Sequence, residues 1–221
     1  MTTDDYRHLP IGDSISFGWE TFKKWPWLLA GVTLAVGIAS AMVNWAQDTV
    51  MEDGWFGLGA LPWLVVYVVH QTIELGMANL FLKLRDHGHA EFSDLFTIFP
   101  RVPALIGANI LAGIAICTGL VFLILPGIYL AIRLRLVPWI IADENMGPID
   151  ALKRSWELTR GHAIDLFIFG MLLFGINIAG LLALVAGLLV SVPVTGIAVA
   201  HMYRFLSAPQ ASDAVSEAPQ V

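Results

Sequence analysis

The sequence predicts an all-α integral membrane protein, a bundle of six transmembrane helices, from three observations. Of the 221 residues, 57% are hydrophobic and only 14% are charged, whereas about a quarter are charged in ordinary soluble proteins. The mean hydropathy is +0.73. Long uncharged runs recur along the chain, and a helix needs about 20 apolar residues to cross a bilayer. These runs predict spans at about 26–46, 61–82, 103–124, 127–142, 164–184 and 187–206.

Helix-breaking residues divide the two longest uncharged runs. No formal charge occurs between Val102 and Ile132, and the apolar region that this run begins is about twice as long as one crossing needs. Pro126-Gly127 is the natural turn within it, because a helix interior tolerates neither residue well. The run from Leu166 to Tyr203 must also fold back, and we expect its turn near Ala183 to Gly187.

The Lys and Arg residues predict the orientation, since short cytoplasmic loops carry a positive excess. Ten of the twelve lie before the first span, between the second and third, between the fourth and fifth, or at the end of the sixth: Arg7, Lys23, Lys24, Lys83, Arg85, Arg101, Lys153, Arg154, Arg160 and Arg204. Both termini are therefore expected to be cytoplasmic. Residues 1–206 form one transmembrane domain, and the tail 207–221, rich in Ser, Ala, Pro and Gln, is predicted to be disordered.

Each basic loop contains a short amphipathic segment just before the next span. Helices with aromatic residues on one face and Lys or Arg on the other lie in the membrane interface. These segments either serve as connecting elbows or engage lipid or a partner through Trp19, Phe22, Phe96, Phe99, Lys153, Arg154 and Trp156. The recurring order of interfacial helix, outward span, turn and inward span is a weak hydropathy repeat, and suggests three parallel units around an axis normal to the membrane.

Polar residues within the spans are the candidate binding residues: Glu74, Arg133, Arg135, His70, Asn109 and His201. Glu74, Arg133 and Arg135 are expected at a similar depth. An unpaired charge at the bilayer centre costs at least about 2.5 to 3.5 kcal/mol, so Glu74 should pair with one arginine inside the bundle. The other arginine should reach lipid head groups or line a second surface. The group is either an ion pair that fixes helix register or a proton, ion or anion site.

The sequence gives no sign of an enzyme, a cofactor or a metal site. It contains no GxSxG, HExxH, phosphate-binding loop or pair of catalytic carboxylates. His70 and Glu74 could offer two metal ligands, but no third ligand follows at a suitable spacing. The net charge of -6 has the wrong sign for a nucleic-acid partner.

Residues 125–162 read LPGIYLAIRLRLVPWIIADENMGPIDALKRSWELTRGH. They carry a Pro-Gly pair, an Arg-bearing span, an acidic loop with Asp143 and Glu144, and a helix containing Trp156. With the final segment VPVTGIAVAHMYRFL, this pattern resembles the bacterial membrane-domain family named after glycerophosphoryl diester phosphodiesterases and its stand-alone six-helix relatives. The resemblance implies a bacterial plasma (inner) membrane protein without an established activity. Arg133 and the Trp156 helix transfer as family features without a known role.

Three functions remain open from the sequence. The leading interpretation is a non-enzymatic accessory, scaffold or assembly protein that engages membrane lipids, a protein partner or a second copy of itself through the amphipathic segments. The alternative is a small permease or channel with a cytoplasm-facing polar cavity around Glu74 and Arg133. A third is an intramembrane lipid enzyme. Transport requires a polar path to the outer face, where Asn177 is the main polar residue in the spans, and this favours the scaffold.

Overall fold

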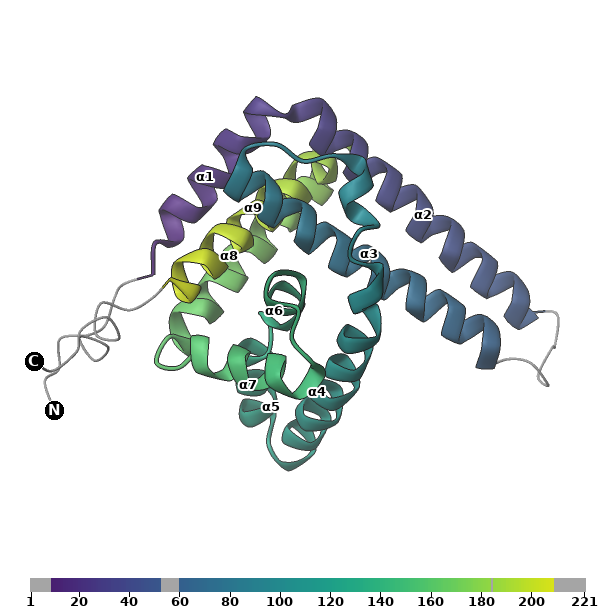
Figure 1. The fold of residues 1–221 in the computed structure, drawn as a ribbon, viewed down its shortest axis with the longest axis vertical. Helices are drawn as coiled ribbons and strands as arrows, with labels where there is room; N and C mark the ends of the chain where they lie inside the picture. The colour runs from purple at the N-terminus through teal and green to yellow at the C-terminus, as the bar shows by residue number, and fades with distance from the viewer. Residues whose placement is uncertain (1–8, 53–59, 184, 209–221) are drawn as a thin grey trace, which may run out of the picture.

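The computed structural model describes residues 9–52, 60–183 and 185–208, and every regular element in these ranges is helical (Figure 1). The elements are α1 (Ile11–Lys24), α2 (Pro26–Glu52), α3 (Ala60–His87), the 3-10 helices η1 (Phe92–Leu95) and η2 (Phe99–Arg101), α4 (Val102–Phe122), α5 (Ile124–Arg133), α6 (Val137–Glu144), α7 (Pro148–Leu158), α8 (Ala163–Leu182) and α9 (Val185–Ser207). The predicted all-α class is confirmed. The predicted disordered tail lies almost entirely outside the described residues.

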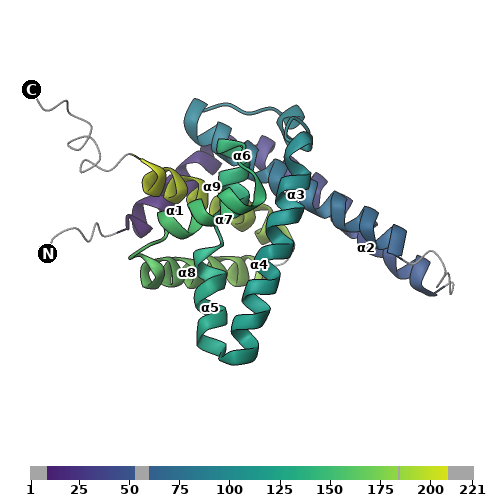
Figure 2. The same cartoon turned by 60° about the horizontal axis from the view of Figure 1, so that its bottom comes forward.

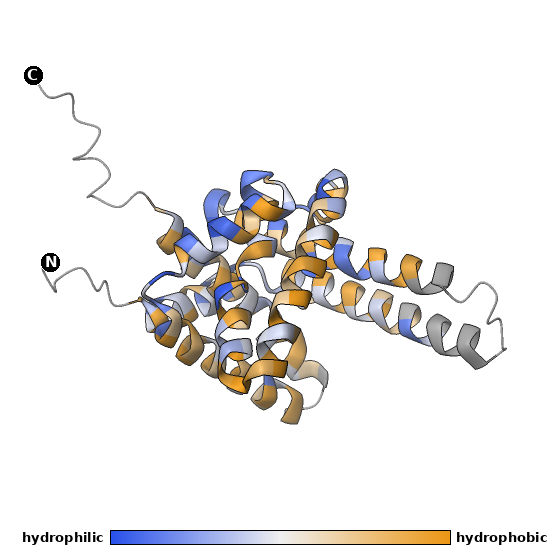
Figure 3. Cartoon of the chain, turned by 90° about the horizontal axis from the view of Figure 1, so that it is seen from below, coloured by the Kyte–Doolittle hydropathy of each residue, from blue (hydrophilic) through white to orange (hydrophobic). Residues whose placement is uncertain are grey.

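Several segments are long and apolar enough to cross a membrane. Five qualify individually: Leu64–His87, Phe92–Phe122, Ile124–Glu144, Ala163–Leu182 and Ala186–Ser207. The helix that corresponds to the first predicted span, α2, qualifies only together with α1, from which it is bent by 99°. Hydrophobic residues run along most of the helices (Figure 3). These features fit a multi-pass membrane protein.

The reversal between α4 and α5 lies at Leu123, so the predicted turn at Pro126-Gly127 was wrong. Leu123 is extended, with φ -163° and ψ 141°, and α5 begins at the next residue. Pro126 is tolerated in the first turn of α5, because the N–H groups there have no intrahelical acceptor. A Cβ on Gly127 would collide with the Leu120 side chain. The Pro-Gly pair therefore allows α5 to pack closely on α4 (Figure 2), rather than forming the turn.

The predicted fourth span, 127–142, consists of two helices. α5 ends at Arg133 and α6 begins at Val137, with a short turn between them. Pro138 lies in the first turn of α6 and has no N–H to donate to the carbonyl of Leu134, which removes one bond that a continuous helix would need. Arg133 is the last residue of α5, and Arg135 lies in the turn between α5 and α6.

The three connecting segments are helical, but the second differs from the prediction. α1 and α7 are α-helices, and Gly161 takes a left-handed conformation (φ 84°) beyond the end of α7. The second segment forms the short 3-10 helices η1 and η2 instead of one α-helix. The Asp94 carboxylate accepts the Glu91 N–H (2.9 Å), which caps the start of η1, and the Lys83 ammonium (2.6 Å), which ties η1 to α3.

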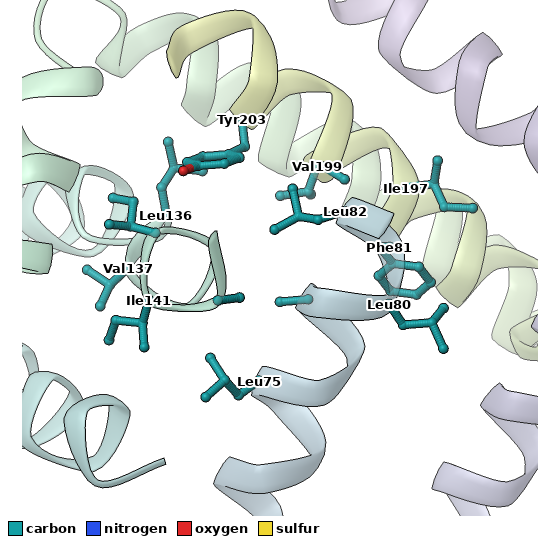
Figure 4. Close-up of a cluster of buried hydrophobic side chains, with 14 of the residues drawn as sticks. Leu75, Leu80, Phe81, Leu82, Leu136, Val137, Ile141, Ile197, Val199 and Tyr203 are labelled. Atoms are coloured by element: carbon teal, nitrogen blue, oxygen red, sulfur yellow. The ribbon is translucent and has the colours of Figure 1, made fainter. Parts of the chain in front are cut away.

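The core lies where α3, α6 and α9 pack together. Figure 4 shows this cluster of buried side chains, which includes Leu75, Leu80, Phe81, Leu82, Leu136, Val137, Ile141, Ile197, Val199 and Tyr203. α1 packs along α9 through its small residues. A Cβ on Gly18 would collide with the backbone oxygen of Val194. The hairpin of α2 and α3 projects beyond the other helices (Figures 1 and 2).

Candidate functional site

Arg133 is buried, with 2% of its surface exposed, and its partners are neutral. Its Nη2 donates to the Trp156 carbonyl (2.6 Å), and its Nη1 donates to the Thr159 carbonyl (3.3 Å) and to Tyr129 Oη (3.2 Å). The guanidinium carbon lies 4.0 Å from the centre of the Trp156 ring. Arg133 is therefore not the arginine that was expected to pair with Glu74.

The contacts of Arg133 join two helix ends. Trp156 and Thr159 lie at the C-terminal end of α7, where backbone carbonyls lack intrahelical partners and carry partial negative charge. In return, Ser155 Oγ donates to the carbonyl of Arg133 at the end of α5 (2.7 Å). Each helix thus supplies hydrogen-bond partners for the last turn of the other. Arg133 positions α7 on the break between α5 and α6.

Arg135 lies in different surroundings from Arg133, as predicted for residues two apart. It is exposed and lines a partly open cavity of about 470 Å³ between α2, α3, α6, α8 and α9. Glu74 lines the same cavity from α3. No ion pair within 4.0 Å forms between them, nor between either residue and any other described residue. The predicted Glu74–arginine ion pair is not present, although the two charges share one cavity.

The hairpin of α8 and α9 supplies the other polar groups of this cavity. Asn177 of α8 donates from Nδ2 to the Leu173 carbonyl (3.0 Å) and to Thr195 Oγ1 of α9 (3.2 Å). Its Oδ1 has no hydrogen-bond partner. The rest of the lining is largely apolar and includes Phe81 and Trp139, whose rings stack with centroids 6.4 Å apart. The cavity therefore contains one carboxylate, one guanidinium, one amide and the Thr195 hydroxyl in an otherwise largely hydrophobic wall.

Three predicted binding residues lie outside this cavity. His70 is exposed on α3, and Asn109 is half-buried on α4. His201 of α9 stacks on Phe17 of α1 with ring centroids 4.6 Å apart. The structure thus brings Glu74 and Arg135 of the predicted set into one cavity. His70 lies outside the lining but one helical turn from Glu74, close enough to interact with it electrostatically, whereas Arg133, Asn109 and His201 are not part of this cavity.

The predicted interfacial residues are mostly exposed. The exposed fraction is 48% for Trp19, 62% for Phe96, 60% for Phe99 and 40% for Trp156. Phe22 is partly buried against the core beside Trp19. Of the basic pair on α7, Lys153 is exposed, whereas Arg154 is half-buried with its Nε 3.5 Å from Glu144.

A polar network that the sequence did not predict joins the ends of α3, α6 and α9. Arg204 of α9 donates from Nε to Asp86 Oδ2 of α3 (2.9 Å) and from Nη1 to Asp143 Oδ2 of α6 (2.6 Å). Tyr203 Oη also donates to Asp143 Oδ2 (2.9 Å). A second cavity of about 340 Å³ lies beside these residues and is also lined by Arg101. The only signal in the sequence was that these charged residues stand near the ends of inward spans.

Comparison with known proteins gives a family but no activity. No curated protein and no solved structure matches this chain. Residues 94–220, more than half of the chain, match the model of a family described as a domain of unknown function (DUF7847). The match includes Arg133, Arg135, Asp143, Trp156 and Arg204, although Glu74 precedes it. The chain belongs to the DUF7847 family.

Proposed function

We propose that this protein is a non-enzymatic scaffold of the bacterial plasma membrane, which holds lipid or a partner protein against its cytoplasmic side through α1, the η1–η2 segment and α7. One observation carries this proposal. Each connecting segment is attached to the bundle by small or aliphatic residues and leaves bulky apolar side chains exposed close to basic ones in the sequence. Trp and Phe beside Lys and Arg are typical of the boundary between lipid and water.

The three attachments have the same form. α1 buries Ser14 and Gly18 against α9, η1 buries Leu95 against α3, and α7 buries Ala151 and Ser155. Each contact fixes the segment and leaves aromatic side chains exposed, although Arg133 covers part of the Trp156 ring on α7. This arrangement supports a surface for lipid or a partner more than a flexible elbow, which would not need large exposed rings.

The resemblance to the membrane-domain family of glycerophosphoryl diester phosphodiesterases is part of this proposal. It supports the bacterial inner membrane as the location, and the distribution of Lys and Arg supports cytoplasmic termini. It contributes no catalytic residue.

Depth-dependent fluorescence quenching tests the proposed surface. Variants that retain only Trp19 or only Trp156 are reconstituted in bilayers with lipids brominated near the head group or deep in the acyl chain. The proposal expects the shallow quencher to act most strongly on both residues, and a variant retaining only Trp139, which lines the cavity, provides the control. Stronger quenching of Trp19 and Trp156 by aqueous iodide than by either lipid would contradict lipid engagement.

A small permease or channel is the second candidate, and the cavity that contains Glu74 and Arg135 favours it. Transport would need a polar path through the bundle. Flux assays on proteoliposomes, comparing the wild-type protein with Glu74→Gln, distinguish this candidate. Flux of a small solute above that of empty liposomes, and its loss in the variant, would replace the scaffold as the leading function.

A further inference from the structure

The cavity between α2, α3, α6, α8 and α9 holds two opposite charges that do not neutralise each other by direct contact. Glu74 and Arg135 both line it, and neither has an ion-pair partner within 4.0 Å in the described part of the chain. Both belong to segments that can span a membrane, where an unpaired charge is costly. A molecule with complementary charges would remove this cost.

The remaining walls indicate what else this molecule contains. Apart from Asn177 and Thr195, the other lining residues are apolar or aromatic, with Phe81 and Trp139 on one side and Phe174 on another. The volume of about 470 Å³ lies within the range of small-molecule sites. Because the cavity is partly open and Phe174 is 61% exposed, a hydrocarbon chain could continue from it along the outside of the bundle. The occupant therefore combines a charged head with an apolar tail.

We propose that this cavity binds a zwitterionic phospholipid, with the lipid phosphate at Arg135 and its ammonium group at Glu74. A guanidinium group matches phosphate oxygens with two parallel hydrogen bonds, and a carboxylate accepts hydrogen bonds from an ammonium group. An anionic lipid would satisfy Arg135 but leave Glu74 unpaired beside a negative phosphate. The site is separate from the exposed aromatic segments, so it can fail while the proposed scaffold function stands.

Lipid selectivity of the full chain tests this site. The protein is reconstituted in nanodiscs with equal amounts of phosphatidylethanolamine and phosphatidylglycerol of the same acyl chains, and the retained lipids are counted by native mass spectrometry. The wild-type protein should retain phosphatidylethanolamine preferentially. Glu74→Gln should lower the ratio of the two lipids by about tenfold, as expected for the loss of one charge-assisted hydrogen bond. Arg135→Gln should lower retention of both lipids.

Matched variants separate the site from general charge effects. Glu20→Gln and Arg160→Gln remove exposed charges of the same types outside the cavity, and should leave the lipid ratio unchanged. Circular dichroism of each variant checks that the helices are retained. If a cavity variant does not fold, the ratio of the two lipids retained by the wild-type protein still tests the proposal. Equal retention of both lipids by the wild-type protein, or no effect of either cavity variant, would overturn the proposal. Displacement of the lipid by excess soluble phosphoethanolamine would overturn a lipid as the occupant, since the tail would then contribute nothing.

Discussion

Replacing Arg133 with methionine should destabilise the protein strongly, because the side chain joins α5 to α7. The change removes a charge-assisted hydrogen bond of 2.6 Å to the Trp156 carbonyl and two longer ones. It also removes the cation–π contact with the Trp156 ring at 4.0 Å. The Thr159 carbonyl keeps a second donor, the N–H of His162 (3.2 Å), and the Trp156 carbonyl keeps only a long bond from the Thr159 hydroxyl (3.4 Å), so the main loss is at Trp156. A strong hydrogen bond, two weaker ones and a partly exposed cation–π contact together give about 3 to 5 kcal/mol.

Arg135→Met is the matched control, since the same change is made two residues away at an exposed and unpaired arginine. It removes no hydrogen bond or ion pair within the described part of the chain, so it should not lower the free energy of unfolding by more than about 0.5 kcal/mol. With about 2 to 4 °C per kcal/mol for a chain of this length, Arg133→Met should lower the melting temperature by about 6 to 20 °C relative to Arg135→Met. The assay is thermal unfolding in mild detergent, followed by tryptophan fluorescence. Equal melting temperatures for the two variants would refute the role assigned to Arg133.

Three further predictions concern packing, the polar network and topology. Gly187→Ala should destabilise the α8–α9 hairpin by about 1 to 3 kcal/mol, because its Cβ would collide with a backbone oxygen of α8. The Cβ of Gly175→Ala would meet no atom within 4 Å, so this variant should be stabilised by about 0.4 to 1 kcal/mol. Thermal unfolding measures both changes. Arg204→Gln should speed hydrogen exchange at the ends of α3, α6 and α9. The difference from wild type should shrink in high salt, since the Asp86 and Asp143 carboxylates that Arg204 binds are 18 to 23% exposed. Equal exchange rates would contradict a structural network. In a cysteine-free background, an impermeant maleimide added to intact cells should label Leu123→Cys, because Leu123 is 67% exposed at the α4–α5 turn. The same reagent should not label Ala208→Cys. The reverse labelling pattern would show that the orientation is opposite to the predicted one.

Most helix positions could be predicted from the sequence, because long uncharged runs have few alternatives in a membrane. Two of the errors fall where a proline permits two outcomes. Pro126 is compatible with a turn or with the first turn of a helix, and Pro138 divides a segment that is long and apolar enough for one span. Hydropathy does not separate these cases. The three-unit arrangement stays a prediction, although the shared core of α3, α6 and α9 is consistent with it.

The pairing of Glu74 could not be predicted because depth along a helix does not specify side-chain surroundings. A glutamate at the same depth would offset the cost of burying the arginine charge. Backbone carbonyls at a helix end also stabilise that charge, and these are the partners that Arg133 has. Those carbonyls became available to Arg133 only because α7 packs on the helix break, which is a tertiary event. The Arg204 network was missed for a related reason, since its residues come from three distant parts of the chain.

The separation of Glu74 and Arg135 follows from how their helices are held. Arg133 and Ser155 fix the end of α5 two residues before Arg135. Stacking of Phe81 on Trp139 fixes α3 against α6 near the same cavity. A shift of the α3 or α6 backbone toward the other would break one of these packed contacts, and close-packed cores resist such shifts. A positive and a negative group therefore line one largely apolar cavity without an ion pair between them, and this supports the proposed binding site.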